Sequence, residues 1–294
     1  MTSTLVLRAH SEARLRKKKR KSKSKGPNRR KKRKQRYEWL PPRWPPFALV
    51  FDCETRTDEL QSLTFGFFWL LQNAGGTYGE VREEGIFYDP EELSVSEIKI
   101  LKRYRRIAKT AKDVARHKVV ILTKKQFIEK YFFPHAEAGS LIVGFNLPFD
   151  LARIASDARA ATRLDHDWSL VFSNGSSNPD RLKKQEFRIK LNRKDSKIAF
   201  ISLSGKFVKR GRFRSRGRFL DLYALAFALT NTSFSLKSLA KELKKKGYKV
   251  PQKAEHEPTG RVTPKEIAYC RQDVRVTSGI LNALRTEFDR HPDL

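Results

Sequence analysis

FALVFDCET, residues 47–55, joins a strand pattern to two acidic side chains placed one residue apart. Residues 47–51 are apolar and rich in strand-forming types, which favours a buried β-strand. Alternate side chains of a strand point to the same face, so we expect Asp52 and Glu54 side by side and Cys53 on the opposite face. Two carboxylates in a dry site repel each other unless a cation lies between them. By itself the stretch fits a divalent-metal site or, more commonly, two solvated acids at a strand end.

The composition indicates a globular protein with a strongly basic extension. The chain has 294 residues, of which 39% are hydrophobic, and a formal net charge of +31. Residues 1–36 contain 17 Lys and Arg against a single acid, Glu12, and the remainder contains 46 basic and 31 acidic residues. Because each phosphate that a protein neutralises releases counterions, a basic surplus in both parts favours a nucleic acid as partner, with an acidic membrane surface as second choice.

Three regions follow from the local composition. Residues 1–36, low in complexity and basic from residue 8 onward, are expected to be a disordered tail, because they repel one another and contain little apolar surface. Residues 37–46 (YEWLPPRWPP) form a stiff Pro-rich linker, and residues 47–294 form the folded domain. Electrostatic anchoring to nucleic acid is the favoured role of the tail; a solubilising extension and a nuclear address are alternatives.

The cysteines and the hydropathy pattern favour an intracellular protein, in the cytoplasm or nucleoid, or in the nucleus of a eukaryote. Cys53 and Cys270 are too few and too far apart in sequence for a disulfide framework or a zinc site. No apolar run approaches the roughly 18 residues that span a bilayer, and residues 1–20 lack the apolar segment of a signal peptide. No membrane partner is therefore expected.

The order of apolar runs and helical patterns predicts an α/β domain built on a mixed sheet flanked by helices. The expected strands are residues 48–52, 63–71, 85–88, 141–145, 168–172, 186–191, 197–203 and 218–222. The expected helices are residues 94–115, 124–133, one starting near 146, 223–229, 235–245 and 264–288.

Capping patterns define the starts of two of these helices. Ser94 with Glu97, and Thr263 with Glu266, have the three-residue spacing of a capping box, and Pro264 suits the first helical position. The last helix is therefore the best defined element of the chain.

Two further motifs place acids near strand or helix ends. The strand at 141–145 runs into Asn146 and Asp150, with Pro148 in the first turn of a helix, so both polar side chains are expected at the mouth of that strand. On the last helix Tyr269 and Asp273 are four residues apart and share a face. An amphipathic helix often contains such a pair for packing alone.

A basic segment with aromatic residues, residues 206–218, fits a single-strand groove, because aromatic rings stack on bases while arginines contact phosphates. An exposed hairpin loop is an equally good interpretation. The residues expected to contact nucleic acid there are Arg212, Phe213 and Arg214.

In order along the chain, the motifs are Asp-x-Glu on a first strand, Asn-x-x-x-Asp after a middle strand and Tyr-x-x-x-Asp on the last helix. This order resembles the three motifs of the DEDD superfamily, 3′→5′ exonucleases with an RNase H-like fold. Ala268 stands where one branch of that superfamily has His, so Tyr269 indicates the tyrosine branch. The segments FDCET, GFNLPFDLARI, FLDLYAL and TPKEIAYCRQDV are similar to the proofreading domain of family B DNA polymerases, especially the protein-primed phage type.

The resemblance implies a role for each matched residue. Tyr269 is expected to orient the attacking water, and Lys249 is the nearest candidate for a lysine that assists at the scissile phosphate. Hard oxygen ligands suit Mg²⁺ or Mn²⁺, and we expect no His or Cys in the site. Two such ions are expected on Asp52, Glu54, Asp150 and Asp273. The 3′-terminal nucleotides are expected to contact Thr55, Asn146 and Phe149.

Asp221 lies near the end of the expected strand at 218–222. For this acid a structural role, or one of supporting the metal ligands without contacting the metal, is favoured over metal binding.

The implied activity is the release of nucleoside monophosphates from 3′ ends of single-stranded DNA, alone or with a separate polymerase or replication protein. Residues 94–135 are expected to be a basic insertion, and no polymerase domain is expected within this chain. Two alternatives remain at this level: a catalytically silent nucleic-acid-binding module of a replication complex, and an RNA exonuclease, which uses the same chemistry.

Overall fold

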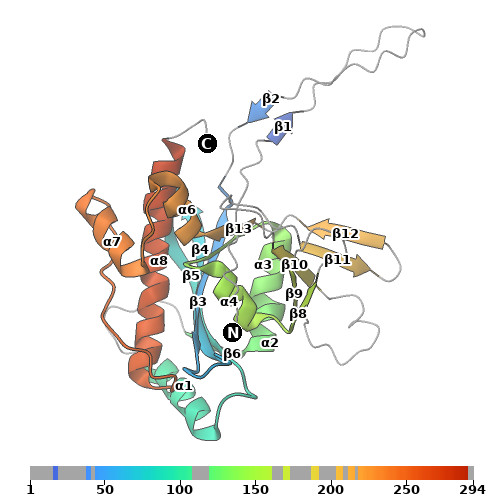
Figure 1. Cartoon of the computed structure of the whole chain (residues 1–294), viewed down its shortest axis with the longest axis vertical. Helices are drawn as coiled ribbons and strands as arrows, with labels where there is room; N and C mark the ends of the chain where they lie inside the picture. Colours follow the sequence, from blue (N-terminus) through green and yellow to red (C-terminus); the bar gives the residue numbers. More distant parts are fainter. Residues whose placement is uncertain are drawn as a thin grey trace.

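The computed structural model describes residues 16–18, 38–40, 44–107, 119–160, 168–172, 187–191, 203–207, 211–215 and 218–290. They form an α/β fold with a six-stranded mixed sheet, helices on both faces of that sheet, and a separate five-stranded antiparallel sheet (Figure 1). The predicted α/β class is confirmed.

The strand order of the main sheet brings three carboxyl ends together. The order is β13-β7-β3-β4-β5-β6; β3 is parallel to β7 and β7 to β13, whereas β4 runs antiparallel between β3 and β5. Parallel neighbours end at the same end of a sheet, which is where α/β proteins place their sites. The strands are β3 (Phe47–Thr55), β4 (Leu63–Ala74), β5 (Thr77–Tyr88), β6 (Val120–Thr123), β7 (Leu141–Gly144) and β13 (Arg218–Asp221).

The first strands are longer than predicted. Because β3 continues to Thr55, Asp52 and Glu54 lie within the paired strand, opposite Phe67 and Phe65 of β4, and not after its end. The edge strand β6 was not predicted. It pairs in parallel with β5, so part of the expected insertion at 94–135 belongs to the main sheet.

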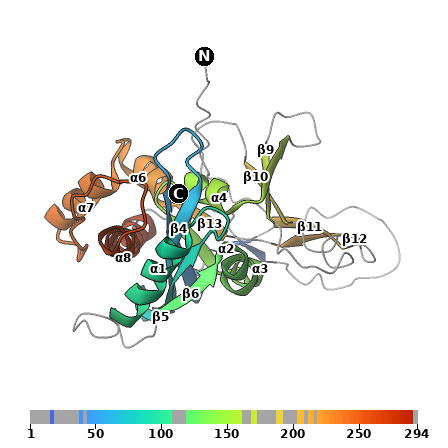
Figure 2. The same ribbon diagram turned by 90° about the horizontal axis from the view of Figure 1, so that it is seen from below.

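One face of the sheet is covered by α1 (Val95–Ile107), α6 (Leu222–Thr230), α7 (Leu236–Lys245) and α8 (Pro264–Asp289). Figure 2 shows α6, α7 and α8 together on this side and α2 and α3 on the other. The Ser94 and Glu97 capping box is confirmed in α1. Thr263 caps α8 as predicted, but the Glu266 carboxylate accepts from Thr259 and not from the cap backbone.

The opposite face is covered by α2 (Lys124–Phe127), the π-helical turn η1 (Ile128–Phe132), α3 (Phe133–Ala138) and α4 (Leu147–Ile154). Phenylalanines dominate this layer: Phe87 stacks on Phe127 with ring centroids 4.0 Å apart. We call these buried rings the aromatic layer: Phe51, Phe68, Phe87, Phe127, Phe132, Phe172 and Phe219.

The second sheet contains β8 (Asp157–Ala160), β9 (Trp168–Phe172), β10 (Phe187–Leu191), β11 (Leu203–Phe207) and β12 (Gly211–Ser215) in the order β12-β11-β10-β9-β8. The strands predicted at 168–172 and 186–191 are confirmed, whereas β8 was not expected. Residues 197–202 lie outside the described residues. Antiparallel β11 and β12 place Arg212, Phe213 and Arg214 in a hairpin strand.

Most of the basic tail and linker lies outside the described residues. Within it, β1 (Arg16–Lys18) and β2 (Glu38–Leu40) pair antiparallel. The disorder expected for residues 1–36 stays a prediction. None of the described helices is both long enough and apolar enough to cross a membrane.

Candidate active site

The alternation of β3 determines which side chains meet α8. Leu49, Phe51 and Cys53 belong to the aromatic layer's cluster, whereas Ala48 and Val50 pack in the cluster with α8. With the same period of two, Asp52 and Glu54 share a face, as the sequence predicted, and in the structure that face is turned toward α8.

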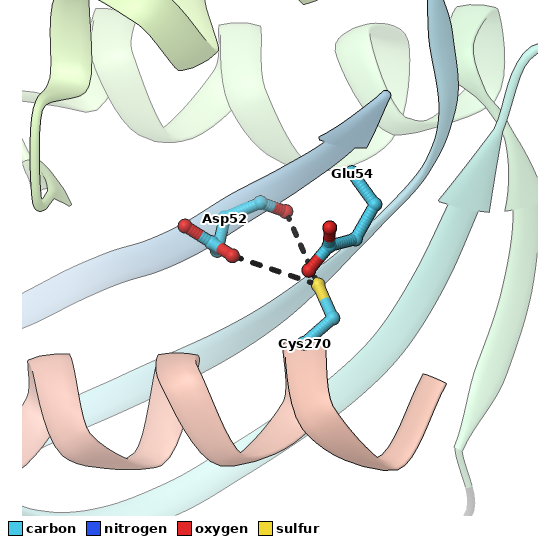
Figure 3. Close-up of side chains that lie close together, drawn as sticks. All are labelled: Asp52, Glu54 and Cys270. Carbon is cyan, nitrogen blue, oxygen red and sulfur yellow. Dashed lines mark hydrogen bonds between the residues drawn. The ribbon is translucent and has the colours of Figure 1, made fainter. Parts of the chain in front are cut away.

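Among the residues that the structure describes, one group of potential metal ligands joins Asp52 and Glu54 to Cys270 of α8. One ligand atom from each of the three side chains lies within 4.8 Å of the others (Figure 3). The Cys270 thiol donates to the Asp52 carbonyl oxygen at 3.7 Å and to Asp52 Oδ2 at 3.8 Å. The expectation of no cysteine at the site is therefore wrong. Cys270 lies 218 residues after Asp52, and only the packing of α8 against β3 brings them together.

Asp150 reaches the same end of the sheet from α4. Its Oδ1 accepts a hydrogen bond from the Cys53 backbone N–H at 3.0 Å, which ties α4 to β3. Its Oδ2 is buried and has no hydrogen-bond partner among the described residues. The turn that places Asp150 includes Asn146, whose φ of 68° lies in the left-handed region that Asn tolerates well.

Asp221 acts structurally, in agreement with the role that the sequence favours. Its Oδ1 accepts from the backbone N–H groups of Asn146 at 2.9 Å and Tyr223 at 3.1 Å. One carboxylate thus caps α6 and holds the turn between β7 and α4.

Asp273, one helical turn after Cys270, completes the acidic group. Its Oδ2 forms a partly buried ion pair with Lys253, and its Oδ1 is buried without a hydrogen-bond partner among the described residues. The Lys253 ammonium also lies 4.6 Å from the centroid of the Tyr269 ring. Tyr269 and Asp273 therefore share a face and a cation.

Lys253 belongs to a segment without regular secondary structure, residues 251–263, which runs beside the start of α8 and which we call the strap. Three contacts anchor it: Gln272 donates to the Gln252 carbonyl at 2.7 Å, Thr259 N–H donates to Glu266 at 2.7 Å, and Arg56 donates to the Gly260 carbonyl at 2.9 Å. These anchors place Lys253 against α8.

Lys253, and not Lys249, is the lysine that contacts the acids. Lys249 is exposed and lies just before the strap. The sequence could not distinguish the two, because the strap has no periodicity from which a facing side chain can be inferred.

Burial and mutual repulsion make the acids difficult to ionise. Desolvation and the charge of Asp273 raise the pKa of Asp52 to about 7. Desolvation and the charges of Asp52 and Asp273 raise the pKa of Glu54 to about 9. Burial likewise raises the pKa of Asp150. Burial also raises the pKa of Asp273, although the charge of Lys253 and its hydrogen bond lower that pKa in part. Without a bound cation, Glu54 is therefore mostly protonated at neutral pH and Asp52 is partly protonated.

Tyr269 and Lys253 keep their protons. Desolvation raises the pKa of the Tyr269 phenol. Burial would lower the pKa of Lys253, but the charge of Asp273 and the hydrogen bond to it raise the pKa above the ordinary lysine value. Both side chains can therefore donate hydrogen bonds at neutral pH.

A polar hollow of about 810 Å³ opens beside Tyr269. His256 of the strap packs on the Tyr269 ring with centroids 4.8 Å apart, and lies 3.7 Å from Glu266. The hollow is lined by Lys237, Lys253, Ala254, Glu255, His256, Glu257, Thr259, Thr263, Lys265 and Tyr269. Three lysines and two glutamates are among the lining side chains, and Lys237 forms an ion pair with Glu255.

The remaining predicted contact residues are placed as follows. Thr55 ends β3, and Asn146 is exposed at the turn before α4. Phe149 is half-buried, with the Arg153 guanidinium 4.6 Å from its ring centroid. Nucleotide contacts by these residues and by Lys249 stay predictions.

The donor set fits divalent cations. Asp150 Oδ2 and Asp273 Oδ1 are buried carboxylate oxygens without a partner among the described residues, an arrangement that costs free energy unless something binds them. The carboxylates of Asp52 and Glu54 add hard oxygen donors of the kind that Mg²⁺ and Mn²⁺ prefer.

Comparison with protein-family models gives no match, and no curated protein matches the chain. The chemistry of these side chains is therefore the ground for a functional proposal.

Proposed function

We propose that the chain is a metal-dependent 3′→5′ exonuclease of the RNase H-like, tyrosine-branch type, which releases nucleoside monophosphates from single-stranded DNA. The observation that supports this most strongly is that four carboxylates from β3, α4 and α8 lie near enough to one another at one end of the sheet for their charges to raise the pKa of a neighbouring acid. The four are Asp52, Glu54, Asp150 and Asp273. The parallel arrangement of β3, β7 and β13 also supports the proposed fold type.

Asp52, Glu54, Asp150 and Asp273 would hold two Mg²⁺ or Mn²⁺ ions. When bound, such ions lower the pKa of an attacking water and stabilise the oxygen that leaves the scissile phosphate. Ligand binding by all four acids explains why the chain keeps carboxylates that repel one another when buried. A protein that only bound nucleic acid would gain nothing from acids facing phosphates.

Tyr269 would orient the attacking water. Its raised pKa keeps the phenol protonated, so it positions the water by a hydrogen bond and does not act as a base. Tyr269→Phe is therefore expected to reduce the rate less than removal of any carboxylate. Lys253 holds both Asp273 and the Tyr269 ring, which suits the assisting position that the sequence assigned to Lys249.

The surface near the site suits a polyanionic substrate. Along α7, Lys237, Lys241, Lys244 and Lys245 are exposed on a helix with a single acid, Glu242. Lys237 also lines the hollow beside Tyr269. A single strand of DNA bound along α7 would have its phosphates close to several lysines before its end reaches the acids.

The test uses the purified full chain with 5′-labelled single-stranded DNA in Mg²⁺ or Mn²⁺. We expect a ladder that shortens from the 3′ end, is abolished by EDTA and is lost in Asp52→Ala/Glu54→Ala. The matched control is Glu91→Ala/Glu92→Ala, which removes two exposed acids outside the site and should leave the ladder unchanged.

Tight, salt-sensitive binding without shortening would contradict the proposal and favour the silent module in a replication complex. A parallel substrate of labelled RNA distinguishes the second alternative, since faster shortening of RNA would reassign the substrate while keeping the chemistry.

A further inference from the structure

A sulfur atom lies among the carboxylates of the proposed metal centre. Cys270 is fully buried on α8, and its Sγ belongs to the group in which Asp52, Glu54 and Cys270 each offer a ligand atom within 4.8 Å of the others. Its thiol is directed at Asp52, and Figure 3 shows all three side chains converging between β3 and α8.

An independent observation points to a ligand beside this group, one helical turn further along α8. Asp273 is 95% buried, as its exposed fraction is 5%, and its Oδ1 has no hydrogen-bond partner among the described residues. It lies three residues after Cys270 on α8, and its charge acts on both Asp52 and Glu54. A cation between β3 and α8 would satisfy this oxygen.

The ligand type decides which cation binds. Mg²⁺ and Mn²⁺ favour oxygen ligands, whereas thiolate sulfur favours Zn²⁺ and other thiophilic ions. Zn²⁺ binds Cys sulfur together with Asp or Glu oxygen in four-coordinate sites. A set of two carboxylates and one cysteine therefore suits a softer ion than the four acids alone.

We propose that Cys270 is a metal ligand and that, with Asp52 and Glu54, it makes the centre bind Zn²⁺ and Cd²⁺ in competition with Mg²⁺ and Mn²⁺. On binding, the S–H bond of Cys270 breaks, its proton passes to solvent and the sulfur lone pair is donated to the ion. The inference rests on the proposed function, because it assigns metal selectivity to the same centre. The exonuclease would then be inhibited by low concentrations of thiophilic ions.

The chain supplies a matched control, since it contains two cysteines in all. Cys53 is also buried, but its thiol donates to the Asp150 carbonyl at 3.8 Å and belongs to the cluster on the other face of β3. Cys53→Ser and Cys270→Ser therefore remove the same atom type on opposite sides of one strand.

The experiment titrates the chelator-treated full chain with CdCl₂ and follows the ultraviolet sulfur-to-cadmium charge-transfer band. We expect the band in wild type and in Cys53→Ser, and its loss in Cys270→Ser. Calorimetry should show Cd²⁺ and Zn²⁺ affinities weakened at least about tenfold in Cys270→Ser, since loss of a ligand should cost no less than loss of a supporting partner. Mg²⁺ affinity should be unchanged.

A band that persists in Cys270→Ser, or no band with wild type, would overturn the inference. Should Cys270→Ser fail to fold by circular dichroism, zinc-edge X-ray absorption on wild type decides instead. One sulfur neighbour at about 2.3 Å supports the inference, and oxygen neighbours alone overturn it.

The two proposals fail in different ways. DNA shortening in Mg²⁺ without a cadmium–sulfur band would keep the exonuclease and exclude Cys270 as a ligand. A band that depends on Cys270, with no shortening in Mg²⁺ or Mn²⁺, would keep the metal centre and exclude the exonuclease.

Discussion

The two faces of β3 pack in different hydrophobic clusters and carry different kinds of side chain. Toward α2 and α3, Leu49 and Phe51 join the aromatic layer, whose rings stack or meet edge to face. Toward α8, the same strand presents Asp52 and Glu54 to other acids and one lysine. One face of β3 stabilises the fold through apolar packing. The other face destabilises it, because buried acids are held close together.

Even on the α8 face, charge is handled in two ways. Glu84 of β5 is fully buried, yet Arg271 donates to both of its oxygens at 2.7 and 2.9 Å and Trp69 donates at 3.0 Å. This group is saturated and needs nothing further. Asp273 of α8, in contrast, keeps one buried oxygen without a partner among the described residues, as does Asp150 of α4, which covers the other face. This difference from Glu84 fits the proposal that Asp150 and Asp273 bind a cation.

The largest effect is expected from a substitution on the α8 face of β3 that leaves the aromatic layer unchanged. Asp52→Ala should lower the single-turnover rate of DNA shortening at least about a thousandfold, because metal stabilisation of the transition state is worth several kcal/mol and each 1.36 kcal/mol is a factor of ten. The melting temperature should not fall. Full metal-dependent activity in both Asp52→Ala and Asp273→Ala would remove the basis for the assigned site.

The second change breaks the aromatic layer. Phe127 stacks on Phe87 and also contacts Phe51 and Phe68, so Phe127→Ala should lower the free energy of unfolding by about 3–5 kcal/mol. Urea unfolding measures this loss. At temperatures where the variant remains folded its rate should stay close to wild type. A variant of wild-type stability would show that the layer is not the main support of β3.

The sequence predicts those features of the fold and the site that depend on residues close together along the chain. The alternation of residues 47–55 predicts which side chains share a face. The cap of α8 predicts where the helix starts, and the four-residue spacing of Tyr269 and Asp273 predicts that they share a face. These depend on nearest neighbours along the chain. Cys270, Lys253 and β6 could not be predicted, because their positions follow from packing between segments far apart in sequence or from a strap without periodicity.

The third test concerns Lys253, the lysine that forms an ion pair with Asp273. Lys253→Ala should slow DNA shortening about 10–100-fold, because Asp273 and Tyr269 lose the group that holds both, and small misplacements cost about this much. Lys249→Ala is the matched control: it removes an exposed lysine four residues away and should change the rate less than about twofold. Equal losses in both variants would point to general electrostatic attraction of the substrate.

The smallest effect measures what the charged side costs the fold. The pKa of Asp52 is raised to about 7 and that of Glu54 to about 9, so the folded chain binds more protons than the unfolded chain between about pH 4 and these values. Stability from these groups is therefore fully present below about pH 4 and is lost as the pH rises through 7 and 9. Because the carboxylates titrate together, the loss should be spread over this window.

Asp52→Asn/Glu54→Gln removes both titrations while keeping side-chain shape. In EDTA the variant should match wild type near pH 4 and exceed it at pH 9 by on the order of 1–3 kcal/mol, measured by urea unfolding at each pH. Mg²⁺ should narrow the difference by stabilising wild type alone, and more so at high pH, since it binds the ionised acids. If the difference in the free energy of unfolding between variant and wild type is constant across this range, the acids ionise in the folded chain as freely as in water. The α8 face of β3 would then carry no electrostatic cost.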